Sequence, residues 1–437
     1  MTTPKDAFVV HPGTPLKGST TVPGDKSISH RAVLFGALAQ GTTQVRAWLP
    51  AGDTEASLAS IQALGVKVER IDSHTLTIHG GKLHESNMPL DLVNAGTGIR
   101  LMAGIMAGQP FQSVLDGSYQ LRRRPMKRIT EPLRKMGAKI EDTGGYCPLV
   151  ISPAQLKGIH YDMPMASAQV KSAILLAALF AEGATTVTQP GPARDHSERM
   201  LGAMGVNLVT DGNTVTLTPG NTLKPMDFAV PGDSSSAAFL AVAGLIVPDS
   251  DLTITGVNLN PTRTGIFEML QAMGGDLTVT ETGLEAGDPV GTIRARYSPL
   301  KGIEVGGEVV VRMIDEFPVF MVASLFAEGE TVVRDAQELR VKETDRLAVM
   351  TAELSKLGAQ ITETDDGFRV KGPQTLTAAV VDGHDDHRIS MSLTVAGLAA
   401  NGQTTVLDAE CAADSFPGYA ETLAKLGADV SVRDLQA

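Results

Sequence analysis

The feature that most constrains the fold is a phrase that recurs six times: the end of a helix, a glycine, and the start of a strand. The copies run from IQALGVKVER to LAKLGADVSV and lie at 61–70, 133–142, 201–210, 270–279, 354–363 and 423–432. A glycine holds the same place in every copy: Gly65, Gly137, Gly205, Gly274, Gly358 and Gly427. Glycine there is typical of a helix C-terminus, where the backbone needs a positive φ. A spacing of roughly 70 residues indicates one supersecondary unit used six times.

A second phrase also occurs six times, upstream of the first: an Ala- and Leu-rich helix that mostly leads into a Gly-Thr-Val strand. The copies lie at 30–45, 99–115, 169–187, 236–254, 317–333 and 387–406. These helices are apolar nearly all round, so we expect them to be buried, with the amphipathic second helix of each unit nearer to solvent. Each unit then reads strand–helix–strand–helix–strand–strand, and the fold class is α/β.

Two near-identical segments divide the six units. VPGDKSISH (22–30) and VPGDSSSAAF (230–239) lie three units apart, and we interpret them as two crossings of one hinge. Six units are too many for a single core. The sequence therefore predicts one domain at 25–229 and a discontinuous one at 1–24 plus 230–437, with the hinge near 22–25 and 229–232. A ligand site at a two-domain hinge is a common arrangement.

Composition and charge exclude several classes of function. The net charge is −12 and there is one Trp, so neither nucleic acid nor an anionic membrane is an expected partner. The two cysteines, Cys147 and Cys411, are expected to be free thiols in a reducing compartment. The N-terminal MTTPKDAFVV lacks a secretory pattern, and the apolar stretches are interrupted by small residues. We therefore expect a cytoplasmic protein.

Polar loops precede the buried helices, and they concentrate the basic residues. They lie at 25–31, 94–100, 166–171, 232–236, 314–318 and 385–388, with further basic segments at 122–125, 194–196 and 340–346. Each has a commoner structural interpretation when taken alone: RRRP as a solvated basic run, RVKETDR as a helix face with ion pairs, DDHR as a capped helix start. Their common place in the repeat favours one cleft that binds small, multiply anionic substrates.

Other chemistries lack their motifs. The chain has no HExxH, CxxC, G-x-S-x-G or G-x-G-x-x-G pattern, and the ligand-type residues of DDHR have no second cluster to complete a metal site. We expect no metal and no organic cofactor.

A set of motifs resembles the EPSP synthase family, the 3-phosphoshikimate 1-carboxyvinyltransferases. In order they are PGDKSISHR, NAGTGIR, RRPMKR, MASAQVKSA, PGDSSSAAF, IDEFP, ELRVKETDRL, DDHRISM and SFP, from about residue 15 to 430. The resemblance implies a two-domain inside-out α/β barrel with three βαβαββ repeats in each domain. It also implies transfer of the enolpyruvyl group of phosphoenolpyruvate to the 5-hydroxyl of shikimate 3-phosphate, with release of phosphate, on the route to chorismate and the aromatic amino acids.

The resemblance assigns residues to each substrate. By it, shikimate 3-phosphate is bound by Lys26, Ser27, Arg31, Ser167, Ala168, Gln169, Arg194, Asp315 and Lys342. Phosphoenolpyruvate is bound by Lys26, Gly96, Arg124, Gln169, Arg346 and Arg388, with Thr97 beside Gly96 in the same loop. The implied catalytic residues are Asp315, which accepts the 5-hydroxyl proton, and Glu343, which protonates C3, with Lys26 a rival for part of the proton traffic.

Two positions depart from the family pattern. Asp414 stands where many members carry a Lys, so this position is left out of the anion site. Gly96 stands where herbicide-tolerant forms often carry Ala, although MASAQVKSA with RDHSE resembles the branch that contains them. Gly leaves room beside phosphoenolpyruvate, so we expect glyphosate to inhibit.

Two alternatives remain. One is a UDP-N-acetylglucosamine enolpyruvyl transferase, most of which use a cysteine on a mobile loop. Here Cys147, in GGYCPLV beside a strand, is expected to be structural. The other is a non-catalytic repeat scaffold that binds a partner along one face. The family is usually monomeric, so a monomer is expected.

Overall fold

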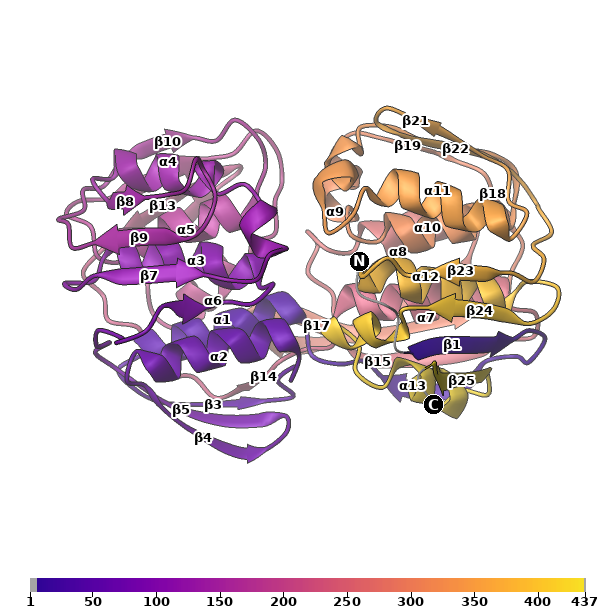
Figure 1. Cartoon of the computed structure of the whole chain (residues 1–437), viewed down its shortest axis with the longest axis horizontal. Coiled ribbons are helices and arrows are strands. Elements are labelled where there is room, and N and C mark those ends of the chain that lie inside the picture. Colours follow the sequence, from indigo (N-terminus) through magenta and orange to yellow (C-terminus); the bar gives the residue numbers. More distant parts are fainter. Residues whose placement is uncertain (1–5, 436–437) are drawn as a thin grey trace. The chain divides into compact units, whose positions relative to one another are not determined.

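The computed structural model describes residues 6–435, and the chain divides into two compact units. Unit 2 comprises Gly24–Pro231 together with Leu284–Asp288, and unit 1 comprises the chain before Gly24, Gly232–Gly283 and the chain from Pro289 onward. Unit 2 is the purple-to-magenta part of the chain in Figure 1, whereas the indigo strand labelled β1 belongs to unit 1. The sequence does not indicate that Leu284–Asp288 belongs with unit 2. The hinge predicted near 22–25 and 229–232 stays a prediction.

Within the described residues, unit 2 contains three four-stranded sheets, in the orders β14-β3-β5-β4, β6-β7-β9-β8 and β10-β11-β13-β12. The strands are β3 (Gly41–Arg46), β4 (Lys67–Asp72), β5 (Thr75–Gly80), β6 (Leu90–Asp91), β7 (Ser113–Asp116), β8 (Lys139–Glu141), β9 (Leu149–Ser152), β10 (His160–Asp162), β11 (Thr185–Thr188), β12 (Asn207–Asp211), β13 (Thr214–Thr218) and β14 (Phe228–Ala229). The helices are α1 (Lys26–Leu38), α2 (Gly52–Ala63), α3 (Gly96–Ala107), η1 (Leu121–Arg123), α4 (Lys127–Lys135), α5 (Ala168–Ala178) and α6 (His196–Ala203).

The described part of unit 1 also contains three sheets, in the orders β16-β17-β15-β2, β18-β20-β22-β21 with β19 paired to β20, and β23-β24-β1-β25. The strands are β1 (Asp6–His11), β2 (Lys17–Thr21), β15 (Asp251–Asn258), β16 (Asp276–Glu285), β17 (Asp288–Arg296), β18 (Leu300–Lys301), β19 (Glu304–Val305), β20 (Ala327–Val333), β21 (Ile361–Thr364), β22 (Gly367–Gly372), β23 (Val380–Asp382), β24 (Thr404–Leu407) and β25 (Asp429–Asp434). The helices are α7 (Ser234–Ile246), α8 (Gly265–Ala272), α9 (Glu308–Arg312), α10 (Phe317–Leu325), η2 (Gln337–Val341), α11 (Arg346–Lys356), α12 (His387–Leu398), η3 (Ala409–Asp414) and α13 (Tyr419–Lys425).

The sheets share one topology, which confirms the predicted repeat. In four of the six sheets of the described residues, two parallel strands are joined through a buried helix and two strands pair antiparallel beside them, as in β6–α3–β7 with β9 and β8. In the other two sheets, β14 and β2 supply the parallel partners of β3 and β15. Three strands reach their sheets from elsewhere in the chain. β1 and β2, near the N-terminus, pair in unit 1, and β14 pairs with β3 in unit 2. The α/β class and the βαβαββ repeat are therefore correct.

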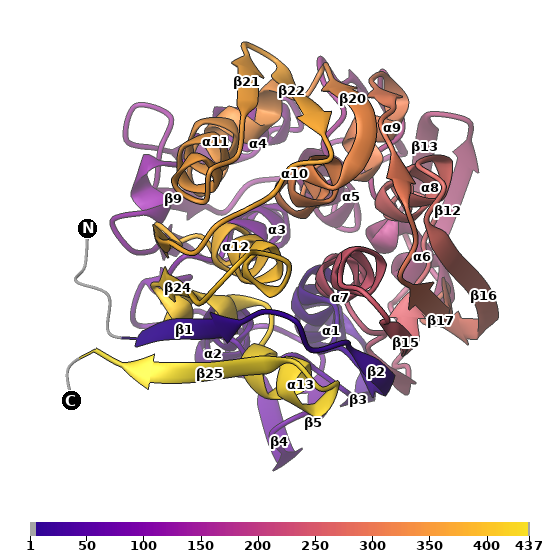
Figure 2. The ribbon, with the colours of Figure 1, turned by 90° about the vertical axis from the view of Figure 1, so that its right-hand side faces the viewer.

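The apolar helices lie at the centre of each unit, as predicted. They are α1, α3 and α5 in unit 2 and α7, α10 and α12 in unit 1, and their side chains are almost all buried. Figure 2 shows α7, α10 and α12 in the middle of unit 1 with strands outside them. Close packing of α3 on α5 depends on Gly104, where a Cβ would lie 2.2 Å from the Ala173 carbonyl oxygen.

The repeated glycines take the predicted backbone conformation. All six have a positive φ, between 82° and 105°. Each ends the second helix of its unit and turns the chain into the next strand. No helix in residues 6–435 has both the length and the apolarity that a membrane crossing requires.

Candidate active site

The first predicted site residue of unit 2, Lys26, opens α1. Asp25 precedes it and caps the helix, because its carboxylate accepts from the Ile28 backbone N–H at 2.9 Å. The Lys26 ammonium lies 2.6 Å from a carboxylate oxygen of Asp53, in the first turn of α2. Asp53 is a residue that the sequence analysis missed, since α1, a strand and a loop separate the two positions in the chain.

Arg31 is held on three sides one turn further along α1. Its Nε donates to Ser197 Oγ at 2.8 Å, its Nη2 to Ser172 Oγ at 3.1 Å, and its Nη1 to the Ser27 carbonyl at 2.9 Å. Burial is the largest influence on this guanidinium and lowers its pKa to about 10, with the positive charge of Arg194 a smaller contribution in the same direction. Arg31 therefore stays charged at neutral pH.

The Gly96 loop, α5 and Arg124 meet in the same unit. Gln169 donates to Thr97 Oγ1 at 3.0 Å and accepts from Arg100 at 2.6 Å. A Cβ on Gly96 would lie 2.7 Å from Arg124 Nη1, so the guanidinium of Arg124 covers this glycine. Arg100 is a second missed residue, and its only sequence signal was its place at the end of NAGTGIR.

The remaining predicted residues of unit 2 lie at helix starts. Ser167 and Ala168 begin α5 directly before Gln169, and Arg194 stands just before α6. Beneath them Lys171 and Glu198 form an ion pair of 2.5 Å with both side chains buried. The predicted positions of unit 2 thus gather around the N-termini of its helices, where unpaired backbone N–H groups favour anions.

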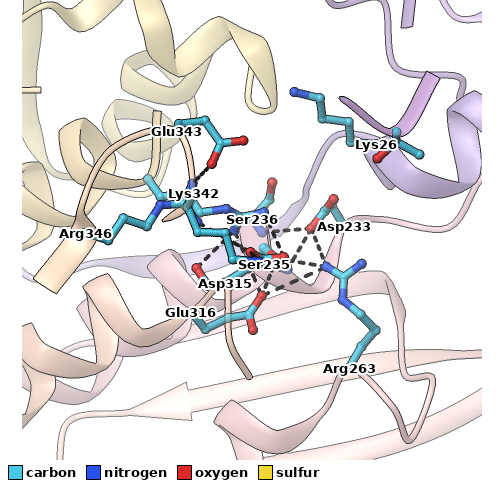
Figure 3. Close-up of polar contacts among 12 residues, drawn as sticks. Lys26, Asp233, Ser235, Ser236, Arg263, Asp315, Glu316, Lys342, Glu343 and Arg346 are labelled. Atoms are coloured by element: carbon cyan, nitrogen blue, oxygen red, sulfur yellow. Dashed lines mark hydrogen bonds and ion pairs between the residues drawn. The ribbon is translucent and has the colours of Figure 1, made fainter. Parts of the chain in front are cut away.

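In unit 1 the predicted residues gather around Arg346 (Figure 3). Its Nη2 donates to Glu343 at 2.8 Å, its Nη1 lies 3.4 Å from Asp315, and its Nε lies 2.8 Å from Asp386. Burial acts to lower the pKa of this guanidinium, but the carboxylates of Asp386, Glu343 and Asp315 outweigh burial and raise it. Arg346 is therefore charged at every pH at which the protein folds.

Asp315 lies among three cations. Besides Arg346, the Lys342 ammonium is 3.7 Å from its Oδ1, and Arg388 Nη2 is 3.9 Å from its Oδ2. Arg388 also donates to the Asp315 backbone carbonyl at 3.4 Å. The five predicted residues of unit 1 are thus brought together, and Asp386, which sequence reasoning did not assign, anchors them.

Neither cysteine is among the predicted site residues. Both are buried and unpaired with each other, as predicted. Burial is the main cause that raises the pKa of Cys147, so its thiol is protonated at neutral pH. A buried, protonated thiol agrees with the structural role that the sequence predicts for Cys147, and that role stays a prediction.

Comparisons with known proteins agree with these motifs. The family model described as EPSP synthase (3-phosphoshikimate 1-carboxyvinyltransferase) matches residues 10–423. A 3-phosphoshikimate 1-carboxyvinyltransferase of Geobacter sulfurreducens is 52% identical, covering 95% of this chain and 98% of the relative. One of Brevibacillus brevis is 48% identical, covering 94% and 97%.

Solved structures show the same likeness. An EPSP synthase from Acinetobacter baumannii matches with a TM-score of 0.90 at 43% identity, covering 98% of this chain and 100% of that one. The enolpyruvyl transferase NikO from Streptomyces tendae matches with a TM-score of 0.82 at 20% identity, which shows the fold alone.

Proposed function

The chain belongs to the EPSP synthase family, and from this premise we propose how its residues transfer the enolpyruvyl group of phosphoenolpyruvate to the 5-hydroxyl of shikimate 3-phosphate. In this reaction the hydroxyl oxygen bonds to C2 as C3 takes up a proton. The tetrahedral intermediate then loses phosphate from C2 and a proton from C3, which leaves the enol ether. The observation that carries the proposal is Asp315, a carboxylate within 4 Å of Lys342, Arg346 and Arg388.

Cations have two roles in the proposal. Both substrates are anions and repel each other, so they bind side by side only if positive groups offset that repulsion. The same groups stabilise negative charge as it develops on the departing phosphate. We assign Arg124, Arg346 and Arg388, with Lys26, Gly96 and Gln169, to phosphoenolpyruvate.

We assign a second, overlapping set of residues to shikimate 3-phosphate. Fixed hydroxyl, amide and guanidinium donors suit its phosphate, and Arg31 is fixed by Ser27, Ser172 and Ser197 before any ligand binds. The residues that we assign to it are Lys26, Ser27, Arg31, Ser167, Ala168, Gln169, Arg194, Asp315 and Lys342.

Two of the carboxylates that contact Arg346, Asp315 and Glu343, are the proposed proton-transfer groups. We propose that Asp315 accepts the 5-hydroxyl proton and that Glu343 donates to C3. Useful acid and base groups need surroundings that separate their proton affinities. Here Asp315 has three cationic neighbours, whereas Glu343 contacts Arg346 and is more exposed, with about a third of its side chain accessible. Lys26 remains a rival for part of this proton traffic.

The alternative substrate is a UDP-linked sugar. A nucleophilic or acidic cysteine on a mobile loop is absent from the described residues, since both thiols are buried. The two free thiols support a reducing compartment, and we propose a cytoplasmic, monomeric enzyme that glyphosate inhibits.

The test is phosphate release by the purified full chain with phosphoenolpyruvate and either shikimate 3-phosphate or UDP-N-acetylglucosamine, with no added metal. We expect release with shikimate 3-phosphate alone. Asp315→Asn should lower kcat by roughly 10²–10⁴-fold, because it removes the general base. The matched control is Asp251→Asn, which alters an exposed ion pair with Arg294 in the same unit. Release with the UDP-sugar alone would overturn the substrate assignment.

A further inference from the structure

Beside Asp315 lies a buried polar network that the proposed mechanism does not use (Figure 3). It consists of Asp233, Ser235, Arg263 and Glu316, and each residue is at most 3% exposed. Charged groups are rarely buried so fully unless they are paired. We call these four residues the Glu316 network.

The network surrounds Glu316 with donors. The Ser235 hydroxyl donates to Glu316 Oε1, and Arg263 Nη2 donates to Ser235 Oγ at 2.8 Å. Arg263 Nη2 also lies 3.3 Å from Asp233 and 4.0 Å from Glu316 Oε1. A hydroxyl donor and a nearby guanidinium thus hold the Glu316 carboxylate in place, next in sequence to Asp315.

Arg388 joins the network to the proposed base. Its Nη1 lies 4.0 Å from Glu316 Oε1, and its Nη2 lies 3.9 Å from Asp315 Oδ2. One guanidinium is thus shared by two neighbouring carboxylates. The second oxygen of Glu316 is buried and accepts no hydrogen bond from the described residues, so the carboxylate is held through Oε1, by Ser235, Arg263 and Arg388.

This sharing matters because neighbouring cations lower the proton affinity of a carboxylate that acts as a base. The positive groups around Asp315 include Lys342, Arg346 and Arg388. The carboxylates that share these cations are Glu316, Glu338, Glu343 and Asp386. Arg263 and Asp233 lie on the other side of Glu316. A positive charge within about 4–6 Å of a carboxylate favours its ionised form by one to three pH units, and a negative charge opposes it. Glu316 therefore offsets part of the cationic field on Asp315.

We propose that Glu316 is a positioning residue that keeps Asp315 basic by holding a share of Arg388. The inference rests on the proposed function, in which Asp315 accepts the hydroxyl proton. Without the charge of Glu316, Arg388 would pair more fully with Asp315. The carboxylate would then hold a proton less tightly and remove one from the 5-hydroxyl less readily.

The test compares the kcat–pH profiles of the full chain and the Glu316→Gln variant at saturating substrates. A general base loses activity as the pH falls and it becomes protonated, which gives the acid limb of the profile. Glu316→Gln keeps an oxygen for the Ser235 hydroxyl but removes the charge. We expect the acid limb to move to lower pH by about one unit, and kcat on the plateau to fall by roughly tenfold or more.

Two further variants separate charge from structure. Glu316→Asp keeps the charge, so its acid limb should stay in place even if kcat falls. Glu304→Gln makes the same change at an exposed glutamate of unit 1 and should alter neither quantity. Because all variants use the same substrates, ionisation of the substrate phosphates cannot produce a difference between them.

An unmoved acid limb in a folded Glu316→Gln variant would overturn the proposal. If that variant does not fold, Ser235→Ala takes its place, since it keeps the charge of Glu316 but removes the hydroxyl that donates to it and accepts from Arg263. Glu316 then takes a larger share of Arg388, so the acid limb should move to higher pH, and no movement would again overturn the proposal. A wild-type chain that releases no phosphate would instead contradict the proposed function.

Discussion

Arg346 and Asp386 form a buried, two-point ion pair. Arg346 Nε lies 2.8 Å from one carboxylate oxygen of Asp386 and Nη2 lies 3.1 Å from the other. Burial acts to raise the pKa of Asp386, and Arg346 outweighs burial and lowers it. The pair fixes the plane of the guanidinium, so its other N–H groups are directed at Asp315 and Glu343.

Asp386→Asn should destabilise the fold by about 3–5 kcal/mol, because it leaves a buried cation without its main partner. Urea unfolding followed by circular dichroism measures this difference. A carboxylate with a lowered pKa stabilises the fold above its unfolded pKa and loses that effect as the pH falls through the folded value. The variant should therefore lose less stability than the wild type below about pH 4. Asp251→Asn is the matched control and should leave the unfolding free energy nearly unchanged.

The buried side chain of His30 should make the unfolding free energy depend on pH over a second, higher pH range. The ring is buried, and Nδ1 lies 2.8 Å from Ser57 Oγ. Burial is the main cause that lowers its pKa from 6.5 to about 3, so the folded protein holds His30 neutral. The unfolded chain takes up a proton below pH 6.5, so stability should fall by up to about 1.4 kcal/mol per pH unit as the pH drops from 6.5 toward 3.

His30→Gln removes this titration while keeping a polar group for Ser57. Unfolding free energies at pH 7.5 and 5.0 should differ by about 2 kcal/mol less in the variant than in the wild type. His160→Gln changes an exposed histidine and serves as the control. Equal pH dependence in the His30 variant and the wild type would contradict a neutral, buried His30.

Asp408 should have the opposite effect to His30, because it should make the fold less stable as the pH rises. Burial is the main cause that raises its pKa from 3.8 to about 6, with the negative charges of Glu410, Asp385 and Asp382 adding to it. An acid whose folded pKa is raised destabilises the fold increasingly as the pH rises from about 4 to about 6, and the full cost remains above that. Asp408→Asn should therefore stabilise the fold by about 1–3 kcal/mol at pH 8 and add nothing at pH 4.

Asp249→Asn is the control for that substitution, because the two positions have nearly the same backbone conformation. Asp408 has a φ of 64°, and the exposed Asp249 has a φ of 60°. Asparagine accepts this left-handed conformation as aspartate does. Asp249→Asn therefore reports any backbone preference without the buried charge. Equal effects of the two substitutions on thermal unfolding would argue against a cost of ionising Asp408.

Gly96→Ala should weaken glyphosate inhibition at least about tenfold, because its Cβ would lie 2.7 Å from Arg124 Nη1 and 3.1 Å from Arg100 Nη1. The guanidinium must shift, and room beside the phosphoenolpyruvate group is lost. Steady-state inhibition with phosphoenolpyruvate varied measures the effect, and the KM for phosphoenolpyruvate should rise less. Gly202→Ala, at a helical position open to solvent, is the control. Unchanged inhibition of the Gly96 variant would sink the steric argument.

The fold could be predicted from the sequence because the same local pattern, an apolar helix and a glycine after the second helix, recurs in every repeat. The apolar helices had to be buried whatever their neighbours, and the glycine after each second helix specified its own backbone conformation. The long hairpin β16–β17 broke this regularity. In the sequence this hairpin appears only as a wider spacing between two of the repeated glycines, Gly274 and Gly358. The contact of His196 with Asp288 at 2.8 Å depends on folding that no local pattern reports.

The site residues were predicted for a different reason, from motifs that indicate residues in contact with ligands. Their roles stay a proposal, but those of unit 1 do gather around Asp315 and Arg346. The partners that orient them were not readable, since Asp53, Asp386 and Glu316 resemble ordinary surface or capping carboxylates in the sequence. Their role follows from distance in space, as with the 40 positions between Arg346 and Asp386.

The pairing of β1 between β24 and β25 has a consequence for synthesis of the protein. The ribosome translates β1 well before either of these partner strands. Most of unit 2 lies in one continuous stretch between them and can fold while the ribosome is still working. β1 therefore stays unpaired until β24 and β25 have been made, so unit 1 is completed only after unit 2 has been translated.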